Sequence, residues 1–220
     1  MKYVYSIDTE PVIEYLASTI SSQLADGKKV LWILSGGSGG KVCAEVSKRL
    51  TGPLNNLLAT LSDERFVPQG HSDENWQQLL DAGFSVTGAT VYRPIQGKDR
   101  GTTTRDLGRW IKQAYEDVDY KIGVFGIGTD GHTAGLKPGT FAVEAANWTT
   151  DFSGEDFERI TMTFNAIEKL DEIVVQAMGA DKATILNELL TKDIDIKQQP
   201  AQVLKSVAKS TIFTDYKKEN

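Results

Sequence analysis

The feature that most constrains the fold is an alternation of short apolar runs with helical patterns along the whole chain. Seven runs rich in Val, Ile, Leu and aromatic residues are predicted as strands, at residues 29–34, 56–61, 89–95, 120–125, 159–164, 172–178 and 210–215. Several are apolar at successive positions rather than at alternate ones, which is typical of strands covered on both faces.

The segments between these runs carry helical periodicity. Val12, Leu16 and Ile20 recur at helical spacing behind Pro11, and Gly27 ends the pattern. Similar helices are predicted at residues 40–50, 73–82, 102–116 and 181–191. This order predicts an α/β fold, a three-layer α/β/α sandwich with a mainly parallel, Rossmann-like sheet. Because no repeat, low-complexity tract or linker interrupts it, residues 1–220 are predicted to form a single domain.

The charge balance and the cysteine count exclude several classes of function. Thirty acidic and 24 basic residues give a net charge of −6, which argues against a nucleic-acid partner because phosphate backbones require a concentrated basic surface. The single cysteine, Cys43, excludes an internal disulfide and a cysteine-based zinc site. We expect no metal and no cofactor. No apolar signal core follows Met1 and no segment approaches the ~20 apolar residues of a spanning helix, so we predict a soluble cytoplasmic protein without a membrane partner.

In parallel α/β folds, ligands gather at the carboxyl ends of strands, where loops lead into helix N-termini. Four polar or glycine-rich loops follow predicted strands, at residues 35–40, 62–68, 126–139 and 179–183. The sequence therefore predicts that these loops meet around one site.

The first loop, "SGGSGGK", resembles a P-loop but has the wrong spacing. Counting back from Lys41 places Ser35 where the first glycine should stand, and Val42 replaces the Ser or Thr that would bind magnesium. A glycine-rich turn that opens a helix still presents free amide groups and a positive dipole end to an anion. The alternative is a tight turn without a ligand.

The third loop contains "GIGTDG", which matches the dinucleotide-binding pattern G-x-G-x-x-G. That pattern should open a helix packed on the sheet, whereas Gly135, Pro138 and Gly139 interrupt this continuation. The same loop places Asp130 two residues before His132. An imidazole is well suited to removing a proton from water near neutral pH, so His132 is a candidate base. The alternative is an ordinary hydrogen-bonded loop histidine.

Charged residues in and near the remaining loops complete a candidate site. In "SDERFVP" a carboxylate such as Asp63 would orient a polar group while Arg65 faces an anionic or developing charge; the alternative is a solvated turn with an internal ion pair. Arg159 and Lys182 are single cations near predicted strand or helix ends. Each alone would be a surface charge, but with residues 35–38 they would form a phosphate clamp.

Six motifs of the chain resemble those of a known family. "LSGGSGG", "LSDERFVP", "SDENWQQL", "GIGTDGHTAGLKPG", "RITMTFNAI" and "GADKA" occur in the order seen in 6-phosphogluconolactonases, which are relatives of glucosamine-6-phosphate deaminases. The resemblance spans residues 30–205, including the late "QQPAQVL". It implies hydrolysis of 6-phospho-D-glucono-1,5-lactone, the second step of the oxidative pentose phosphate pathway, by a monomer or small homo-oligomer that binds a small sugar phosphate and requires no cofactor.

The resemblance also implies roles for individual residues. His132 matches the base that activates water, Asp130 belongs to the same motif and would help orient the site, and Arg65 matches an arginine placed to meet substrate charge. The positions that match the sugar-phosphate-binding set are Ser35, Gly36, Gly37, Ser38, Arg159 and Lys182. The amides of Gly128 and Gly131 are candidate donors to the oxyanion of the tetrahedral intermediate.

Three other functions stay open beside the lactonase. Glucosamine-6-phosphate deaminases carry a glutamate five residues after the motif histidine, where this chain has Lys137, and the loss of that carboxylate favours the lactonase. A sugar-phosphate-binding protein without turnover would keep the clamp, but retention of both Asp130 and His132 argues against it. A nicotinamide-dependent dehydrogenase comes last.

Overall fold

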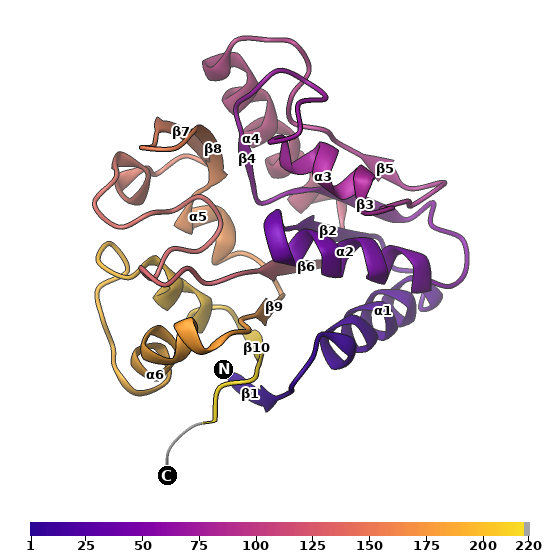
Figure 1. The fold of residues 1–220 in the computed structure, drawn as a ribbon. Helices are drawn as coiled ribbons and strands as arrows, with labels where there is room; N and C mark the ends of the chain where they lie inside the picture. Colours follow the sequence, from indigo (N-terminus) through magenta and orange to yellow (C-terminus); the bar gives the residue numbers. More distant parts are fainter. Residues whose placement is uncertain (218–220) are drawn as a thin grey trace.

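Seven parallel strands form the central sheet of the computed structural model, which describes residues 1–217 (Figure 1). The strand order is β1-β10-β9-β6-β2-β3-β5. The strands are β1 (Lys2–Tyr5), β2 (Val30–Leu34), β3 (Leu57–Leu61), β5 (Thr90–Val91), β6 (Tyr120–Phe125), β9 (Glu172–Gln176) and β10 (Lys209–Thr214). Every pairing in this sheet is parallel, as the alternation of strands and helices predicted.

Helices cover both faces of this sheet. The first face carries α1 (Glu10–Ala25), α2 (Gly37–Arg49) and α3 (Asn75–Asp81), and the second carries α4 (Arg100–Asp117), α5 (Phe164–Ile167) and α6 (Ala183–Thr191). Figure 1 shows α1 and α2 on one side of the strands and α5 and α6 on the other. The predicted three-layer sandwich is therefore confirmed.

Strand β2 shows why the apolar runs do not alternate with polar residues. Trp32 and Leu34 pack in the core beneath α1, α2 and α3, while Leu31 and Ile33 pack in the core beneath α4, α5 and α6. All of these side chains are fully buried. A strand with a helix layer on each face must be apolar at every position.

A second, antiparallel sheet of three strands corrects part of the sequence prediction. It contains β4 (Asp63–Arg65), β8 (Glu158–Met162) and β7 (Thr149–Ser153), in the order β4-β8-β7. The run at residues 159–164 belongs to this small sheet and not to the parallel one, and part of the loop predicted at 62–68 is strand β4. Only residues 154–157 join β7 to β8, and so short a connection allows antiparallel pairing alone.

Element boundaries differ from the prediction in three further places. Helix α2 begins at Gly37, so most of the glycine-rich loop lies in its first turn rather than before it. Strand β5 covers only Thr90–Val91 of the run predicted at 89–95, in which Pro94 cannot donate to a strand ladder. The edge strand β1 escaped prediction because it is short and only half-buried.

The part of the chain that the structure describes contains no helix long and apolar enough to cross a membrane. Within residues 1–217, no group of three or more His, Cys, Asp or Glu side chains is arranged to hold a metal ion. Cys43 lies fully buried in α2, where burial raises the pKa of its thiol to about 12.

Helix α4 packs against strand β7 at Gly108, and this contact generates a stability prediction. A Cβ atom at Gly108 would lie 2.5 Å from Thr149 Oγ1, and that hydroxyl donates a 2.7 Å hydrogen bond to the Thr104 carbonyl. Alanine normally favours a helix over glycine by ~1 kcal/mol, but here it would displace Thr149. We expect Gly108→Ala to lower the free energy of unfolding by about 1–2 kcal/mol in urea denaturation.

Gly101 in the first turn of α4 provides the control. A Cβ atom there would meet only the ends of the Arg105 and Asp99 side chains, at 3.4 and 3.6 Å, so Gly101→Ala should be neutral or stabilising. The double substitution Gly108→Ala/Thr149→Ala should recover part of the free energy of unfolding that Gly108→Ala loses. Equal stability of the Gly108→Ala and Gly101→Ala variants would contradict the assigned contact.

Candidate functional site

A cleft of about 380 Å³ lies at the carboxyl ends of four neighbouring strands. Its lining includes residues that directly follow β2, β6 and β9, two residues of β4, which begins two residues after the end of β3, and Arg159 of β8. Strands β2 and β6 lie side by side, and the chain runs from β2 towards one edge and from β6 towards the other. Parallel sheets bind ligands at such a reversal, so the predicted convergence of separated loops is confirmed.

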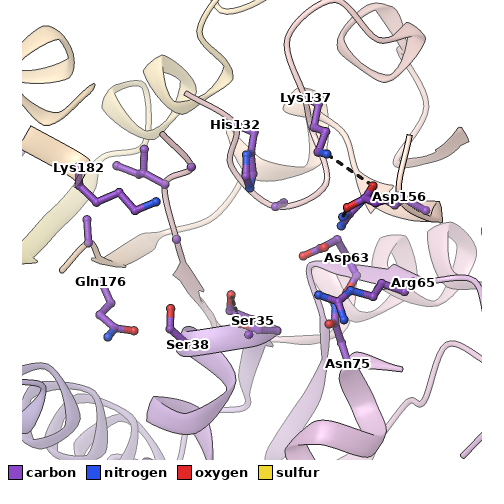
Figure 2. Close-up of a pocket in the computed structure, with 18 of the residues that line it drawn as sticks. Ser35, Ser38, Asp63, Arg65, Asn75, His132, Lys137, Asp156, Gln176 and Lys182 are labelled. Atoms are coloured by element: carbon purple, nitrogen blue, oxygen red, sulfur yellow. Dashed lines mark hydrogen bonds and ion pairs between the residues drawn. The ribbon is translucent and has the colours of Figure 1, made fainter. Parts of the chain in front are cut away.

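His132 faces this cleft and is paired with Asp130. The Asp130 Oδ1 atom lies 2.6 Å from His132 Nδ1 and accepts a 3.1 Å hydrogen bond from the His132 backbone amide. Nδ1 is thereby occupied, which leaves Nε2 for a ligand or water. Figure 2 shows the imidazole across the cleft from Ser35 and Ser38.

The environment of Asp130 keeps it ionised. Partial burial acts to raise the pKa of its carboxyl, but the amide hydrogen bond and the charge of His132 outweigh burial, and the pKa lies below its ordinary value. Asp130 is not part of the cleft lining. Asp130 therefore influences a ligand in the cleft only through the imidazole that it orients.

The two glycines predicted as oxyanion donors do not offer free amides. The Gly128 N–H donates to the His132 carbonyl at 2.9 Å, and the Gly131 N–H donates to the Gly128 carbonyl at 3.0 Å. Gly128 is instead needed for space, since a Cβ atom there would overlap the His132 ring and the Asp130 carboxylate. Gly131 adopts a φ of +83°, which favours glycine. Both therefore shape the loop, and this part of the prediction is wrong.

Contacts from distant segments hold the histidine loop in place. The Gly131 carbonyl accepts a hydrogen bond from the Ala201 amide at 2.9 Å. The Gly135 amide donates to Thr161 Oγ1 of β8 at 3.0 Å. Between them Ala134 adopts a φ of +49°, a conformation that costs a non-glycine residue ~1–2 kcal/mol. The loop is thus pre-formed by its surroundings rather than by its own preferences.

Strand β4 divides the side chains of the "DER" segment between two faces, as alternation along a strand requires. Asp63 and Arg65 line the cleft. Glu64 is fully buried on the other side and accepts amide hydrogen bonds from Arg65, Asn75 and Trp76 at 2.8, 2.6 and 3.0 Å. Burial raises the pKa of Glu64 to about 8, although these amides favour its charged form. Glu64 therefore fixes the start of α3 relative to β4.

Asp63 is a buried acid beside cations. Burial raises the pKa of its carboxyl, while the Ser62 hydroxyl, which donates to it at 2.8 Å, and the nearby charges of Arg159, His132 and Arg65 act in the opposite direction. The net direction is upward. Asp63 thus holds a proton more readily than an ordinary aspartate, which suits a group that exchanges protons or hydrogen bonds with a ligand.

Two arginines are direct cross-strand neighbours in the small antiparallel sheet. Arg65 and Arg159 occupy directly opposite positions of the antiparallel strands β4 and β8. The Phe157 ring lies 4.7 Å from Arg65 Cζ and 5.9 Å from Arg159 Cζ. The Nε atoms of both arginines are buried without a hydrogen-bond partner among the described residues. Like charges directly opposite are unfavourable, so this end of the cleft is suited to an anion.

Asp156 supplies a negative charge to this cation group. Its Oδ2 accepts a 2.6 Å hydrogen bond from Arg159 Nη2, and its Oδ1 lies 3.6 Å from Lys137 Nζ. Burial acts to raise the pKa of Asp156, but the Arg159 hydrogen bond and charge lower it to about 2. The carboxylate is therefore charged across the neutral range and neutralises cations that a bound anion would use.

The residues predicted as a phosphate clamp all line the cleft, but their cations form two groups. Ser35, Gly36, Gly37 and Ser38 lie at the start of α2. In Figure 2, Lys182 lies on one side of this segment, while Asp156, which binds Arg159, lies on the other. A phosphate held by both cations would have to lie between them, over the first turn of α2.

Three polar cleft residues escaped the sequence prediction: Asn75, Asp156 and Gln176. Asn75 donates to the Asp63 carbonyl at 3.1 Å, and its amide occupies the space of a Cβ atom at Gly36. Gln176 had a signal, because it is the polar last residue of an otherwise largely apolar strand. Asp156 had none, since its contact depends on the β7–β8 turn.

The position of Asp156 generates a binding prediction. Replacing Asp156 by Asn removes the charge that competes with an added anion for Arg159 and Lys137. Half-exposed ion pairs contribute up to ~1 kcal/mol, so we expect Asp156→Asn to bind inorganic phosphate about threefold to fivefold more tightly in calorimetric titration.

Glu155→Gln is the matched control, because Glu155 is the exposed neighbour in the same turn and its substitution removes the same charge. It should leave phosphate affinity within about 1.5-fold of the parent. Weaker binding by Asp156→Asn would mean that Asp156 holds Arg159 in a productive position instead of competing with the ligand.

Comparison with known proteins is consistent with this geometry. The chain is 27% identical to a 6-phosphogluconolactonase of Helicobacter pylori over 157 residues, which is 69% of this chain and 68% of the relative. It is 26% identical to the 6-phosphogluconolactonase of Synechocystis over 207 residues, 89% and 85% of the two chains. The Thermotoga maritima enzyme of that name is 26% identical over 211 residues, 92% and 91% of the two chains.

Solved structures share the fold. The crystal structure of the Thermotoga maritima 6-phosphogluconolactonase superimposes with a TM-score of 0.84 at 22% identity, over 97% of this chain and 98% of that one. A monomeric glucosamine-6-phosphate deaminase superimposes with a TM-score of 0.79 at 18% identity, over 97% of each chain. The family model described as "Glucosamine-6-phosphate isomerases/6-phosphogluconolactonase" matches residues 9–213. The chain therefore belongs to the family of glucosamine-6-phosphate isomerases and 6-phosphogluconolactonases.

Proposed function

We propose that the protein hydrolyses 6-phospho-D-glucono-1,5-lactone to 6-phospho-D-gluconate. The observation that carries this proposal is the Asp130–His132 pair, which presents an imidazole nitrogen to a cleft lined by cations from β4, β8 and the segment after β9. A lactone is an activated ester, so its hydrolysis requires a positioned water, a base and stabilisation of the developing oxyanion. The names of the curated relatives support the same substrate.

In the proposed reaction, His132 acts first as a base and then as an acid. A water molecule attacks the carbonyl carbon, a carbon–oxygen bond forms, and the water proton passes to Nε2. The tetrahedral intermediate then collapses, the bond between the carbonyl carbon and the ring oxygen breaks, and Nε2 returns the proton to that oxygen as a hydroxyl. Asp130 holds the imidazole by its Nδ1 atom at 2.6 Å and stabilises its charged form between the two steps.

Other cleft residues are assigned to binding and charge stabilisation. The cations Arg159 and Lys182, with Ser35–Ser38 at the start of α2, would hold the phosphate and so fix the remote end of the substrate. Because the Gly128 and Gly131 amides are occupied, Arg65 is the better candidate to meet the developing oxyanion. Asp63 would orient a hydroxyl or water beside His132.

Lys137 favours the lactonase over the deaminase. It lines the cleft and lies 3.6 Å from Asp156, so the position that carries a glutamate in the deaminase motif presents a cation here. A lactone opens by addition of water and has no need of that carboxylate. A single catalytic domain over residues 1–220, a cytoplasmic location and a monomer or small homo-oligomer stay predictions from the sequence.

Removal of the imidazole is the primary test. We expect His132→Ala to lower kcat for freshly generated 6-phosphogluconolactone by about 10²–10⁴-fold relative to the parent. Affinity for 6-phosphogluconate should stay within about threefold, because the phosphate is held elsewhere in the cleft. Loss of lactone above its spontaneous rate measures the first quantity, and calorimetry measures the second.

The other histidine provides the control. His71 is exposed and lies 3.5 Å from Asp73, outside the cleft lining, so His71→Ala should keep the parent activity. Full turnover by His132→Ala would remove the base assignment. Absence of lactonase activity in the parent, with tight 6-phosphogluconate binding, would indicate a sugar-phosphate-binding protein, and deamination of glucosamine 6-phosphate would indicate the other branch of the family.

The Asp130 carboxylate generates a prediction on pH dependence. The reaction needs neutral His132, so kcat/KM should fall as the pH is lowered. Asp130 stabilises the charged imidazole, and Asp130→Asn removes that counter-ion. The acidic limb of the kcat/KM profile should therefore move to lower pH, while the maximum falls at least about tenfold because the ring is less well oriented. A limb that moves to higher pH, or does not move, would contradict the assigned contact.

A further inference from the structure

Gln176 is a buried polar side chain at the edge of the cleft. It ends strand β9, all five residues of which are buried, and it is 9% exposed. Its side chain lies on the same face of β9 as Val174, which packs in the core beneath α1 and α2. A valine or leucine would fit that environment without polar atoms to satisfy.

The Gln176 side-chain amide has no hydrogen-bond partner among the residues that the structure describes. Its Oε1 atom is buried and accepts no hydrogen bond from any residue in 1–217. Buried polar atoms are nearly always hydrogen-bonded, and leaving one unpaired costs folding free energy. Such an exception calls for a partner that arrives from outside the chain. Because Gln176 lines the cleft, a ligand or its water shell can provide that partner.

The neighbours of Gln176 indicate which ligand group it would meet. In Figure 2, Gln176 and Ser38 lie on the same side of the cleft as Lys182. The Lys182 ammonium and the free amides at the start of α2 only donate hydrogen bonds, and a phosphate dianion only accepts them. The side-chain amide of Gln176 has an NH2 group that donates hydrogen bonds and an oxygen that accepts them. That oxygen would repel a phosphate, whereas a hydroxyl group can pair with either atom of the side-chain amide.

We propose that Gln176 is a substrate-binding residue that hydrogen-bonds a hydroxyl group of the sugar-acid carbon chain and so selects polyhydroxylated ligands. This inference rests on the proposed function, since it concerns the same cleft and ligand. In this arrangement the cations of the cleft bind the phosphate, and the neutral Gln176 side chain recognises the carbon chain. A ligand of equal length and charge but without hydroxyl groups would leave this amide unpaired, so the cleft would bind it more weakly.

The test compares two ligands and two forms of the protein. The first ligand is 6-phosphogluconate, and the second is 6-phosphohexanoate, which has the same carboxylate, phosphate and chain length but no hydroxyl groups. Gln176→Met keeps the side-chain length and removes both polar atoms. We expect this variant to bind 6-phosphogluconate about tenfold more weakly and 6-phosphohexanoate within about twofold of the parent, by calorimetry. KM for the lactone should rise with kcat nearly unchanged.

Stability measurements separate binding from folding. Gln176→Met should keep or raise Tm, because an unpaired buried amide is removed. The matched control is Gln202→Met, since Gln202 is also buried but hydrogen-bonds Gln199 and lies outside the cleft lining. That variant should lower Tm and leave both affinities unchanged. If Gln176→Met fails to fold, the shorter amide in Gln176→Asn should show the same selective loss with 6-phosphogluconate.

Two binding outcomes would overturn the inference. Equal losses for both ligands would place Gln176 at the phosphate or carboxylate, and unchanged affinities would make its burial purely structural. These binding results do not depend on turnover. A parent protein without lactonase activity whose Gln176→Met variant loses 6-phosphogluconate selectively would refute the proposed reaction and keep the role of Gln176. Normal turnover with equal losses would refute only the role of Gln176.

Discussion

The parallel alignment of β9, β6, β2 and β3 is the constraint on which the rest of the structure depends. These four strands are neighbours in the sheet, although they stand far apart in the sequence. Parallel strands all end at the same edge, so the segments that follow them must meet there. The apolar runs that form the strands, buried on both faces, thus decide where the polar loops lie. Core packing and site geometry are consequences of the same topology.

The small antiparallel sheet adds what the parallel sheet cannot supply. Pairing of β4 with β8 sets Arg65 opposite Arg159, and the turn between β7 and β8 brings Asp156 and Phe157 to these guanidinium groups. A protein with a net charge of −6 thereby keeps a local cluster of cations beside its cleft. The cation cluster of this acidic chain is therefore suited to a small anionic ligand.

The histidine loop lines the cleft, as its motif predicted, but its glycines do not have the predicted role. Gly128 was predicted to donate its amide to an oxyanion, but that amide is already bonded to the His132 carbonyl. Its value lies in the missing side chain, because Asp130 and His132 pack where a Cβ atom would be. The loop then depends on Thr161 and Ala201, from distant segments.

The sequence by itself determined the layers of the fold and most residues of the cleft, because burial on two faces leaves an unbroken apolar run and because motifs such as "GIGTDGHTA" keep their residues together. Gln176, a polar residue at the end of such a run, escaped the prediction, and its lack of a partner among residues 1–217 is known only from the structure. Only the tertiary structure decided that residues 159–164 leave the main sheet, that Asp156 neutralises Arg159, and which amides are free. Those outcomes depend on hydrogen bonds and charges between segments distant in sequence, and local residue preferences carry no record of them.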